Sequence, residues 1–355
     1  MKRLTLSVVA LCIVFAAPSF AQKRKSSKKD QLATKEKAAK NVVKPESNDD
    51  AMRAASLKSE KKIGKLEKRL SENRKRQLAN MRGILRRKPL YKGKANLLFR
   101  IAEEEWKEAK YLYFLSRKDY DGKYEAYLNG TLKAKPKEPK ADYSKALVEY
   151  KKLLKEFPNY RRLDEVIFYL GQGLITAGKK KEGASYMVRL TKEYPRSKYK
   201  TRAYLAVAEY YFDNDLLFAA KTNYLKVTED KRSGEYPYAL YKLGYVYYNL
   251  REYEDSIKSF KAVVALGNKK DKRGVYFKNQ SYSALSLSFA EVPEGWKRAR
   301  DYYREQGGEK LATERLEKIA RIYNKQDKTS DEIDVYEYLI SARKQGRRYR
   351  STRPT

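Results

Sequence analysis

Two residue types that build many active sites are almost missing from this 355-residue chain. Histidine is absent, and the one cysteine, Cys12, lies in an apolar stretch near the N-terminus. The remainder of the chain therefore cannot form zinc fingers, other Cys/His metal sites, Ser-His-Asp or Cys-His catalytic centres, or a disulfide framework. Any enzyme chemistry would have to use carboxylates, lysine, tyrosine or a cofactor.

Long apolar runs are scarce too, and the run at residues 4–17 is only 14 residues long. A membrane-spanning helix needs about 20 residues. Two basic residues precede the run and Pro18 ends it, while Ser19 and Ala21 place small residues before a cut after Ala21. This is the pattern of a secretory signal peptide at residues 1–21. We therefore expect an exported protein, soluble in the periplasm or associated with the envelope. An uncleaved anchor is the alternative.

Acidic residues are in deficit, with 45 Asp and Glu against 81 Lys and Arg, and the formal net charge is +36. Residues 22–94 contain 25 of the basic residues but only 8 acids. The composition of residues 22–50, with almost no bulky apolar side chains, predicts disorder. From 51 to 85, apolar residues recur at helical spacing without a sustained heptad, which predicts a basic helix rather than a coiled coil.

This basic low-complexity arm is a candidate for attachment to an acidic partner or an anionic surface, such as lipid, lipopolysaccharide or the cell wall. A solubilising tether is the alternative. A second basic segment, at residues 345–355, closes the chain. A basic composition of this kind is also typical of nucleic-acid-binding proteins. The sequence, however, has no helix-turn-helix spacing and no RNA-binding aromatic signature. The export signal argues against nucleic acid as a partner.

Small residues recur at a nearly fixed interval in the second half of the chain, separated by 37, 36, 40 and 36 residues. They are Gly171, Ala208, Gly244, Ala284 and Ala320. Sixteen residues after four of them stands a bulky residue: Met187, Tyr224, Phe260 and Tyr336. This pattern predicts stacked antiparallel helix pairs that approach closely at the small residues. The expected pairs are 162–177 with 181–194, 199–213 with 216–228, 237–249 with 253–266, 276–290 with 296–306, and 309–324 with 330–344.

The repeat resembles the tetratricopeptide repeat (TPR) over roughly residues 95–344, with an earlier pair at 95–117 and 143–157. An insertion at about 118–141 separates that pair, as a long loop or a helical extension. The resemblance implies an all-α fold, a TPR α-solenoid of antiparallel helix pairs, behind a disordered or helical basic N-terminal arm. The period, with the segments FPNY and YPRS, is similar to exported bacterial envelope TPR proteins. Those include outer-membrane assembly scaffolds, Tol–Pal coordinators and gliding-motility proteins.

The resemblance also implies a concave face lined by the first helix of each pair. With the small residue as position eight, the groove positions are two, five, nine and twelve. They are Glu165, Phe168, Gln172 and Ile175, then Arg202, Leu205, Glu209 and Phe212, then Tyr238, Tyr241, Tyr245 and Tyr248. The four tyrosines form one stripe at helical spacing, and tyrosine is enriched in interfaces. Packing against a neighbouring repeat is the alternative role for the stripe.

No residue pattern favours an enzyme. The adjacent acids Glu103, Glu104 and Glu105 point to different faces of a helix, and no GxGxxG or P-loop motif is present. We expect no catalytic residues, cofactor, metal or small-molecule substrate. The predicted function is a non-catalytic envelope scaffold or adaptor that binds envelope proteins or peptides through the concave TPR face. The alternatives are a cell-wall or lipopolysaccharide-binding module, and a nucleic-acid-binding TPR protein if the signal peptide is not used.

Overall fold

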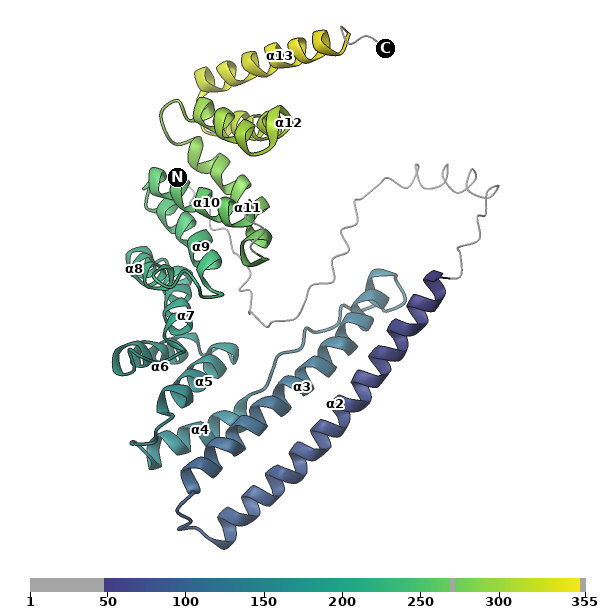
Figure 1. Cartoon of the computed structure of the whole chain (residues 1–355), viewed down its shortest axis with the longest axis vertical. Coiled ribbons are helices and arrows are strands. Elements are labelled where there is room, and N and C mark those ends of the chain that lie inside the picture. The colour runs from purple at the N-terminus through teal and green to yellow at the C-terminus, as the bar shows by residue number, and fades with distance from the viewer. Residues whose placement is uncertain (1–47, 269–271, 352–355) are drawn as a thin grey trace. The chain divides into compact units, whose positions relative to one another are not determined.

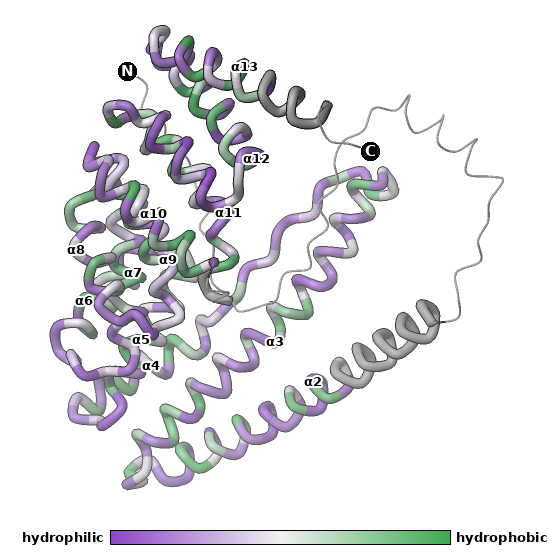
Figure 2. The backbone as a smooth tube through the Cα atoms, turned by 45° about the horizontal axis from the view of Figure 1, so that its top comes forward, coloured by the Kyte–Doolittle hydropathy of each residue, from purple (hydrophilic) through white to green (hydrophobic). Residues whose placement is uncertain are grey.

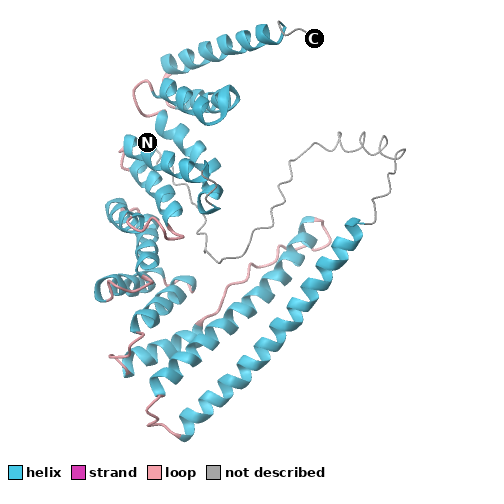
Figure 3. Ribbon diagram, in the orientation of Figure 1, coloured by secondary structure: helices cyan, strands magenta, loops and turns pink. Residues whose placement is uncertain are grey.

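The computed structural model describes residues 48–268 and 272–351, with the side chains of residues 64–268 and 275–343. Across these ranges there are twelve helices and no strand (Figure 3), which confirms the all-α fold class. None of the helices in these ranges has both the length and the apolar character that crossing a membrane requires. The predicted signal peptide, its cut after Ala21 and the first part of the basic arm lie outside the described residues.

The chain divides into two compact units, residues 1–146 and 147–355. In the first unit, α2 (Asn48–Arg87) and α3 (Lys94–Leu128) lie side by side as a long antiparallel hairpin (Figure 1). The division expected near residue 94 therefore falls inside a packed hairpin. The helix expected at 51–85 belongs to this hairpin, where its later apolar residues Leu78 and Met81 meet the partner helix.

Contacts between α2 and α3 combine a small apolar core with buried carboxylates. Leu78 and Met81 of α2 pack against Ile101 of α3. Farther from the turn that joins the two helices, Glu108 of α3 accepts hydrogen bonds from the Ser71 hydroxyl at 2.6 Å and from Arg74 Nε at 2.9 Å. Basic residues of α2 are therefore partly neutralised inside the protein, and their charge is not all available to an external surface.

The predicted insertion is a helical extension followed by an irregular segment. Helix α3 continues to Leu128, and residues 129–143 then return without regular structure. Arg117 forms a 2.6 Å ion pair with Glu138, which fixes the returning segment to the helix. At its end the ring of Tyr143 stacks on Trp106 with centroids 3.9 Å apart.

The second unit is a stack of helix pairs in which each pair packs on the next (Figure 1). After α4 (Ser144–Glu156), which crosses the boundary between the units, come α5 (Leu163–Thr176), α6 (Lys180–Glu193), α7 (Lys200–Asp213), α8 (Leu217–Thr228), α9 (Tyr236–Asn249), α10 (Tyr253–Asn268), α11 (Lys272–Phe289), α12 (Gly295–Lys325) and α13 (Thr329–Ser351). Helices α5 to α10 begin and end within two residues of the predicted bounds. Hydrophobic and hydrophilic residues alternate along these helices, as their packing on one face requires (Figure 2).

Helix α12 contains two helical segments, because Gly307 and Gly308 have non-helical backbone angles. Both segments share one apolar core with α11 and α13, and the second segment forms the last helix pair with α13. The ten-helix expectation for residues 162–344 therefore holds once this break is counted. Helix α13 runs seven residues past the predicted end at 344.

The helix pairs of the second unit share one turn geometry. A residue with left-handed backbone angles follows the small residue by seven positions in four pairs: Gly178, Asp215, Arg251 and Asp327. In the pair of α11 and α12 it is Glu294, three positions later, because the sequence VPEG lengthens the turn. This conformation ends a helix and reverses the chain.

The recurring small residues lie where the two helices of a pair cross. A Cβ atom added to Gly244 would lie 2.7 Å from the ring of Phe260, sixteen residues later on α10. Phe260 itself is fully buried in a cluster with Ile257, Tyr282 and Leu285. The spacing of sixteen in the sequence is therefore the contact between one helix and its antiparallel neighbour.

Candidate protein-binding face

The predicted groove positions lie on the first helices of three consecutive pairs, α5, α7 and α9. Glu165, Phe168 and Leu205 are buried, and Arg202 is exposed. The others are half-buried: Gln172, Ile175, Glu209, Phe212, Tyr238, Tyr241, Tyr245 and Tyr248. For several of these side chains, partial burial comes from contacts with the next first helix along the stack, which are described below.

Between α5 and α7 the contact is a carboxylate and two stacked rings. Glu165 accepts a hydrogen bond from the Tyr199 hydroxyl at 2.6 Å and another from Arg162 Nε at 2.9 Å. The rings of Phe168 and Tyr199 stack with centroids 4.4 Å apart, and the guanidinium of Arg202 covers Phe168 at 4.7 Å. Burial acts to raise the pKa of Glu165, but the hydrogen bonds from Tyr199 and Arg162 outweigh it and hold the pKa below its ordinary value.

Between α7 and α9 the contact centres on Glu209. This carboxylate accepts hydrogen bonds from the hydroxyls of Tyr224 and, at 3.1 Å, Tyr238. It also pairs with Lys242 at 3.4 Å, and the Lys242 ammonium lies 4.0 Å from the centroid of the Phe212 ring. A buried lysine is thus compensated by a carboxylate and an aromatic face. Burial, with the charge of Glu209, raises the pKa of Tyr238, which therefore stays a neutral donor.

Between α9 and α11 the contact is almost entirely aromatic. Tyr241 stacks on Phe277 of α11 with centroids 5.3 Å apart and meets Tyr245 edge to face at 5.2 Å. Both tyrosines also pack against the edge of Phe260, at 6.0 and 5.2 Å. Tyr276 lies edge to face with Phe277 at 4.9 Å and is 50% exposed. The cluster therefore begins in the core of the helix pair and reaches solvent on α11.

The tyrosine stripe extends this pattern to the C-terminal pairs. The Tyr248 hydroxyl donates to Glu291 at 3.4 Å, and Glu291 also accepts from Gln326 at 2.5 Å. Burial and the charge of Glu291 raise the pKa of Tyr248 to about 12. A tyrosine hydroxyl thus donates to a glutamate at the α5–α7 contact, at the α7–α9 contact and between α9 and the turn that follows α11.

The groove positions predicted from each first helix alone did not include four residues that complete these contacts between repeats. They are Tyr199, Lys242, Tyr276 and Phe277. Tyr199 and Lys242 were detectable only by aligning each first helix with the next. The stripe therefore serves packing between repeats, and the exposed part of the face lies at its edge, on α11.

An open hollow of about 810 Å³ lies beside the α5–α6 turn, lined by Lys179, Lys180, Lys181, Tyr210 and neighbouring polar residues. Its walls are exposed lysines, and Lys180 already pairs with Asp213 at 2.7 Å. Within the described residues, no group of three or more acidic side chains is placed to hold a metal ion.

A stack of antiparallel helix pairs with a shared turn and small residues at the crossings defines an α-solenoid repeat protein. The family model described as tetratricopeptide repeat matches residues 238–266, which include most of α9 and most of α10. No curated protein matches the sequence. The matched repeat and the repeated helix pairs together support the predicted assignment as a tetratricopeptide-repeat protein. Such proteins are scaffolds for protein–protein interaction.

Among solved structures, a MamA crystal structure is similar at 20% identity and TM-score 0.33, over 52% of this chain and 90% of MamA. A tetratricopeptide repeat protein from Parabacteroides merdae has 14% identity and TM-score 0.40, over 64% of this chain and 80% of its own. BtubC from P. vanneervenii has 11% identity and TM-score 0.37, over 81% and 94%. All three TM-scores are below 0.5, so the family assignment comes from the matched repeat and the repeated helix pairs.

Proposed function

We propose that this TPR protein is an exported scaffold of the bacterial cell envelope, and that it binds a protein partner on the aromatic edge formed by α9 and α11. The observation that carries the proposal is the ring cluster of Tyr241, Phe277 and Tyr276, which is anchored in the core and reaches solvent at Tyr276 and at exposed Val275. Exposed aromatic side chains held rigidly by packing lose little entropy when they bind.

The chemistry of the edge favours an extended or helical peptide with apolar side chains. The exposed side chains of Val275 and Tyr276 are apolar except for the Tyr276 hydroxyl. The ring of Phe277 is held between an edge-to-face contact with Tyr276 and a stacked contact with Tyr241. A helix-in-groove or extended peptide mode needs a few such anchors rather than a deep pocket.

Export and attachment rest on the sequence. The signal peptide pattern at residues 1–21 supports an envelope location, and the positive charge of residues 22–94 supports attachment to an anionic surface or an acidic partner. The first test is the N-terminal sequence of the native protein in cell fractions. A start at Gln22 in the envelope fraction supports export, whereas a start at Met1 in the cytoplasm overturns it.

Site-specific photocrosslinking tests the aromatic edge in living cells. A photoreactive phenylalanine replaces Tyr276, and in a matched control it replaces Phe218, which is 72% exposed on the second helix α8. Both positions are exposed aromatics in the same unit, so they sample two faces with equal reactivity. We expect a discrete crosslinked protein from position 276 and none of that mass from position 218.

The change Tyr276→Ser should then remove that partner from the native protein while leaving its helical content unchanged. Phe218→Ser is the control for loss of an exposed ring. Identical crosslinks from both positions, or retention of the partner by Tyr276→Ser, would contradict the aromatic edge. Release from membranes between 0.1 and 1 M NaCl tests the arm separately, because salt screens exposed charge much more than apolar contact.

A further inference from the structure

Helix α13 exposes an apolar stripe that its counterpart α10 buries. Equivalent positions of α10 and α13 are 76 residues apart, so Ile257, Phe260 and Val264 of α10 correspond to Ile333, Tyr336 and Ile340 of α13. The exposed fractions are 3, 1 and 0% on α10 but 51, 42 and 55% on α13. Helix α11 covers the α10 residues, and among the described residues no helix covers the α13 stripe.

The stripe borders a hollow between α12 and α13, where a further first helix would pack. This hollow, about 120 Å³, is lined by Glu317 and Arg321 of α12 and by Tyr336, Leu339, Ile340 and Arg343 of α13. Its floor is Leu339, and its rim has the ion pair of Arg343 with Glu317 at 2.6 Å. The surface therefore offers apolar contact bordered by charge.

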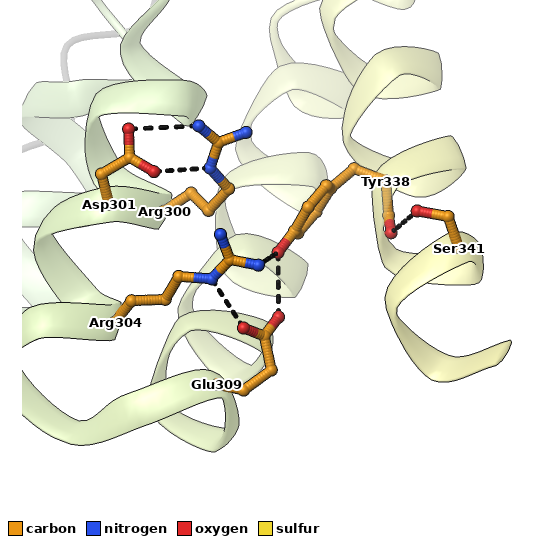
Figure 4. A network of polar contacts seen from close by, with 6 residues as sticks. All are labelled: Arg300, Asp301, Arg304, Glu309, Tyr338 and Ser341. Carbon is orange, nitrogen blue, oxygen red and sulfur yellow. Dashed lines mark hydrogen bonds and ion pairs between the residues drawn. The ribbon is translucent and has the colours of Figure 1, made fainter. Parts of the chain in front are cut away.

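Helix α13 is fixed from its opposite side. Tyr338, two residues from both Tyr336 and Ile340, donates to Glu309 at 2.9 Å and accepts from Arg304, which itself pairs with Glu309 at 2.6 Å (Figure 4). Val335 and Leu339 are buried in the core of the last pair. The stripe is thus presented on a helix whose orientation is already set.

The charges of α13 are divided between its two halves. Residues 331–337 contain four acids and no base, and residues 343–350 contain five basic residues and no acid. Ile340 lies between the two halves. Two such helices in antiparallel register place the acidic half of each beside the basic half of the other. About an axis near Ile340, the Ile340 side chains of the two copies meet, and Ile333 and Tyr336 of each copy lie opposite positions 347 and 344 of the other.

We propose that α13 is a homodimer interface, in which the α13 helices of two copies pair antiparallel about a twofold axis near Ile340. The charge pattern selects a second copy over the chain's own basic arm. Residues 22–50 offer few bulky apolar side chains for the stripe, and their positive charge would face the basic half of α13. A second α13 covers Ile340 with its own copy and places each acidic half opposite the basic half of the other copy.

Sedimentation velocity of the purified native protein measures the association. The change Ile333→Ser with Ile340→Ser should weaken dimerisation at least tenfold, about 1.4 kcal/mol. Both side chains are already half-exposed, so the fold should tolerate the change. Leu216→Ser with Phe218→Ser is the matched control, since it removes two exposed apolar side chains from α8 and should leave the dimer intact.

A charge-exchange experiment distinguishes pairing between two α13 helices from the effect of charge on the stability of α13 itself. Asp334→Lys with Glu337→Lys leaves residues 331–337 with two acids and two lysines, and Lys344→Glu with Arg347→Glu leaves residues 343–350 with three bases and two acids, so each variant loses most of the net charge of one half. Each variant should be largely monomeric alone, and an equal mixture should form heterodimers. Stabilisation of the helix dipole by end charges predicts no such recovery. A monomeric native protein at about 100 μM, a dimer that survives the double serine change, or a mixture that fails to associate would each overturn the proposal.

Discussion

Helices α10 and α13 hold equivalent places in two helix pairs, and their apolar residues match position by position. In α10 those residues lie beneath α11, and in α13 they face outward beside an open hollow. Burial at a repeat position therefore depends on the next helix as well as on the repeat's own residues. The outermost pair of an array with an apolar outer face needs a cover, because apolar surface of this kind favours association.

The largest expected effect compares Phe260 with Tyr336, which are equivalent but differ in burial. Phe260→Ala should lower the free energy of unfolding by about 3–5 kcal/mol, because it leaves a cavity in a closed core. Tyr336→Ala should cost about 1 kcal/mol or less in the monomer, where the ring is already half-exposed. Urea denaturation at low protein concentration measures both values. Equal losses would show that the two positions are packed alike.

The helix crossings offer a smaller contrast. Gly244→Ala should cost about 1–3 kcal/mol, since the new Cβ atom would lie 2.7 Å from the buried Phe260 ring. The equivalent residue of the last pair, Ala320, already has this Cβ atom, and Ala320→Gly should cost about 1 kcal/mol through helix propensity. Thermal unfolding followed by circular dichroism measures both. A stabilised Gly244→Ala protein would show that the Phe260 ring moves freely.

Acid should affect a buried joint more than an exposed one. Hydrogen bonds hold the pKa of Glu165 below its ordinary value despite burial, and the Arg304 contact lowers the pKa of Glu309. A lowered pKa adds stability above the unfolded value near 4.5, which is lost as the pH falls through the folded value.

At pH 7, Glu165→Gln should therefore cost about 2 kcal/mol, and Glu309→Gln less than about 1 kcal/mol because Glu309 is exposed. The gap between wild type and Glu165→Gln should narrow as the pH falls from 5 to 3. Denaturant unfolding across that range checks the result. A constant gap would mean that Glu165 stays charged throughout.

The smallest expected effect concerns the turns of the same two pairs. Arg251 has φ of 63° in the α9–α10 turn, and Asp327 has φ of 56° in the α12–α13 turn. Arg251→Gly should stabilise the protein by about 0.5–1 kcal/mol, because glycine accepts this conformation without a Cβ clash. Asp327→Gly should gain less, since aspartate tolerates the left-handed region better. The difference in melting temperature between the two variants checks their order.

The sequence predicted the helices of the second unit well because their signals are local. Apolar periodicity, a small residue such as Gly171 and a turn residue such as Gly178 all lie within one helix pair of fewer than 40 residues. The hairpin of α2 and α3 was not predicted. Its pairing depends on Glu108 meeting Ser71 and Arg74, more than 30 residues away, and single charged residues on a basic helix give no signal for such a partner.

Binding at the predicted groove positions stays a prediction, and the structure adds the packing contacts that these side chains make. Tyr241 and Tyr245 do lie on the first-helix face, but they contact Phe260 and Phe277 as part of the packing between repeats. The proposed binding edge moves to Tyr276 on α11. Helical spacing predicts on which face of its helix a side chain lies. The position of the neighbouring helix determines how exposed that side chain is.

For this protein the sequence by itself determined the all-α class, the period of the repeats and the place of each turn, since these follow from backbone conformation and local apolar spacing. Only the tertiary structure decided which equivalent residues are covered. Ile257 and Ile333 are the same residue in the same helical pattern. One is buried because α11 packs over it, and the other is free to meet a second molecule because no described helix does.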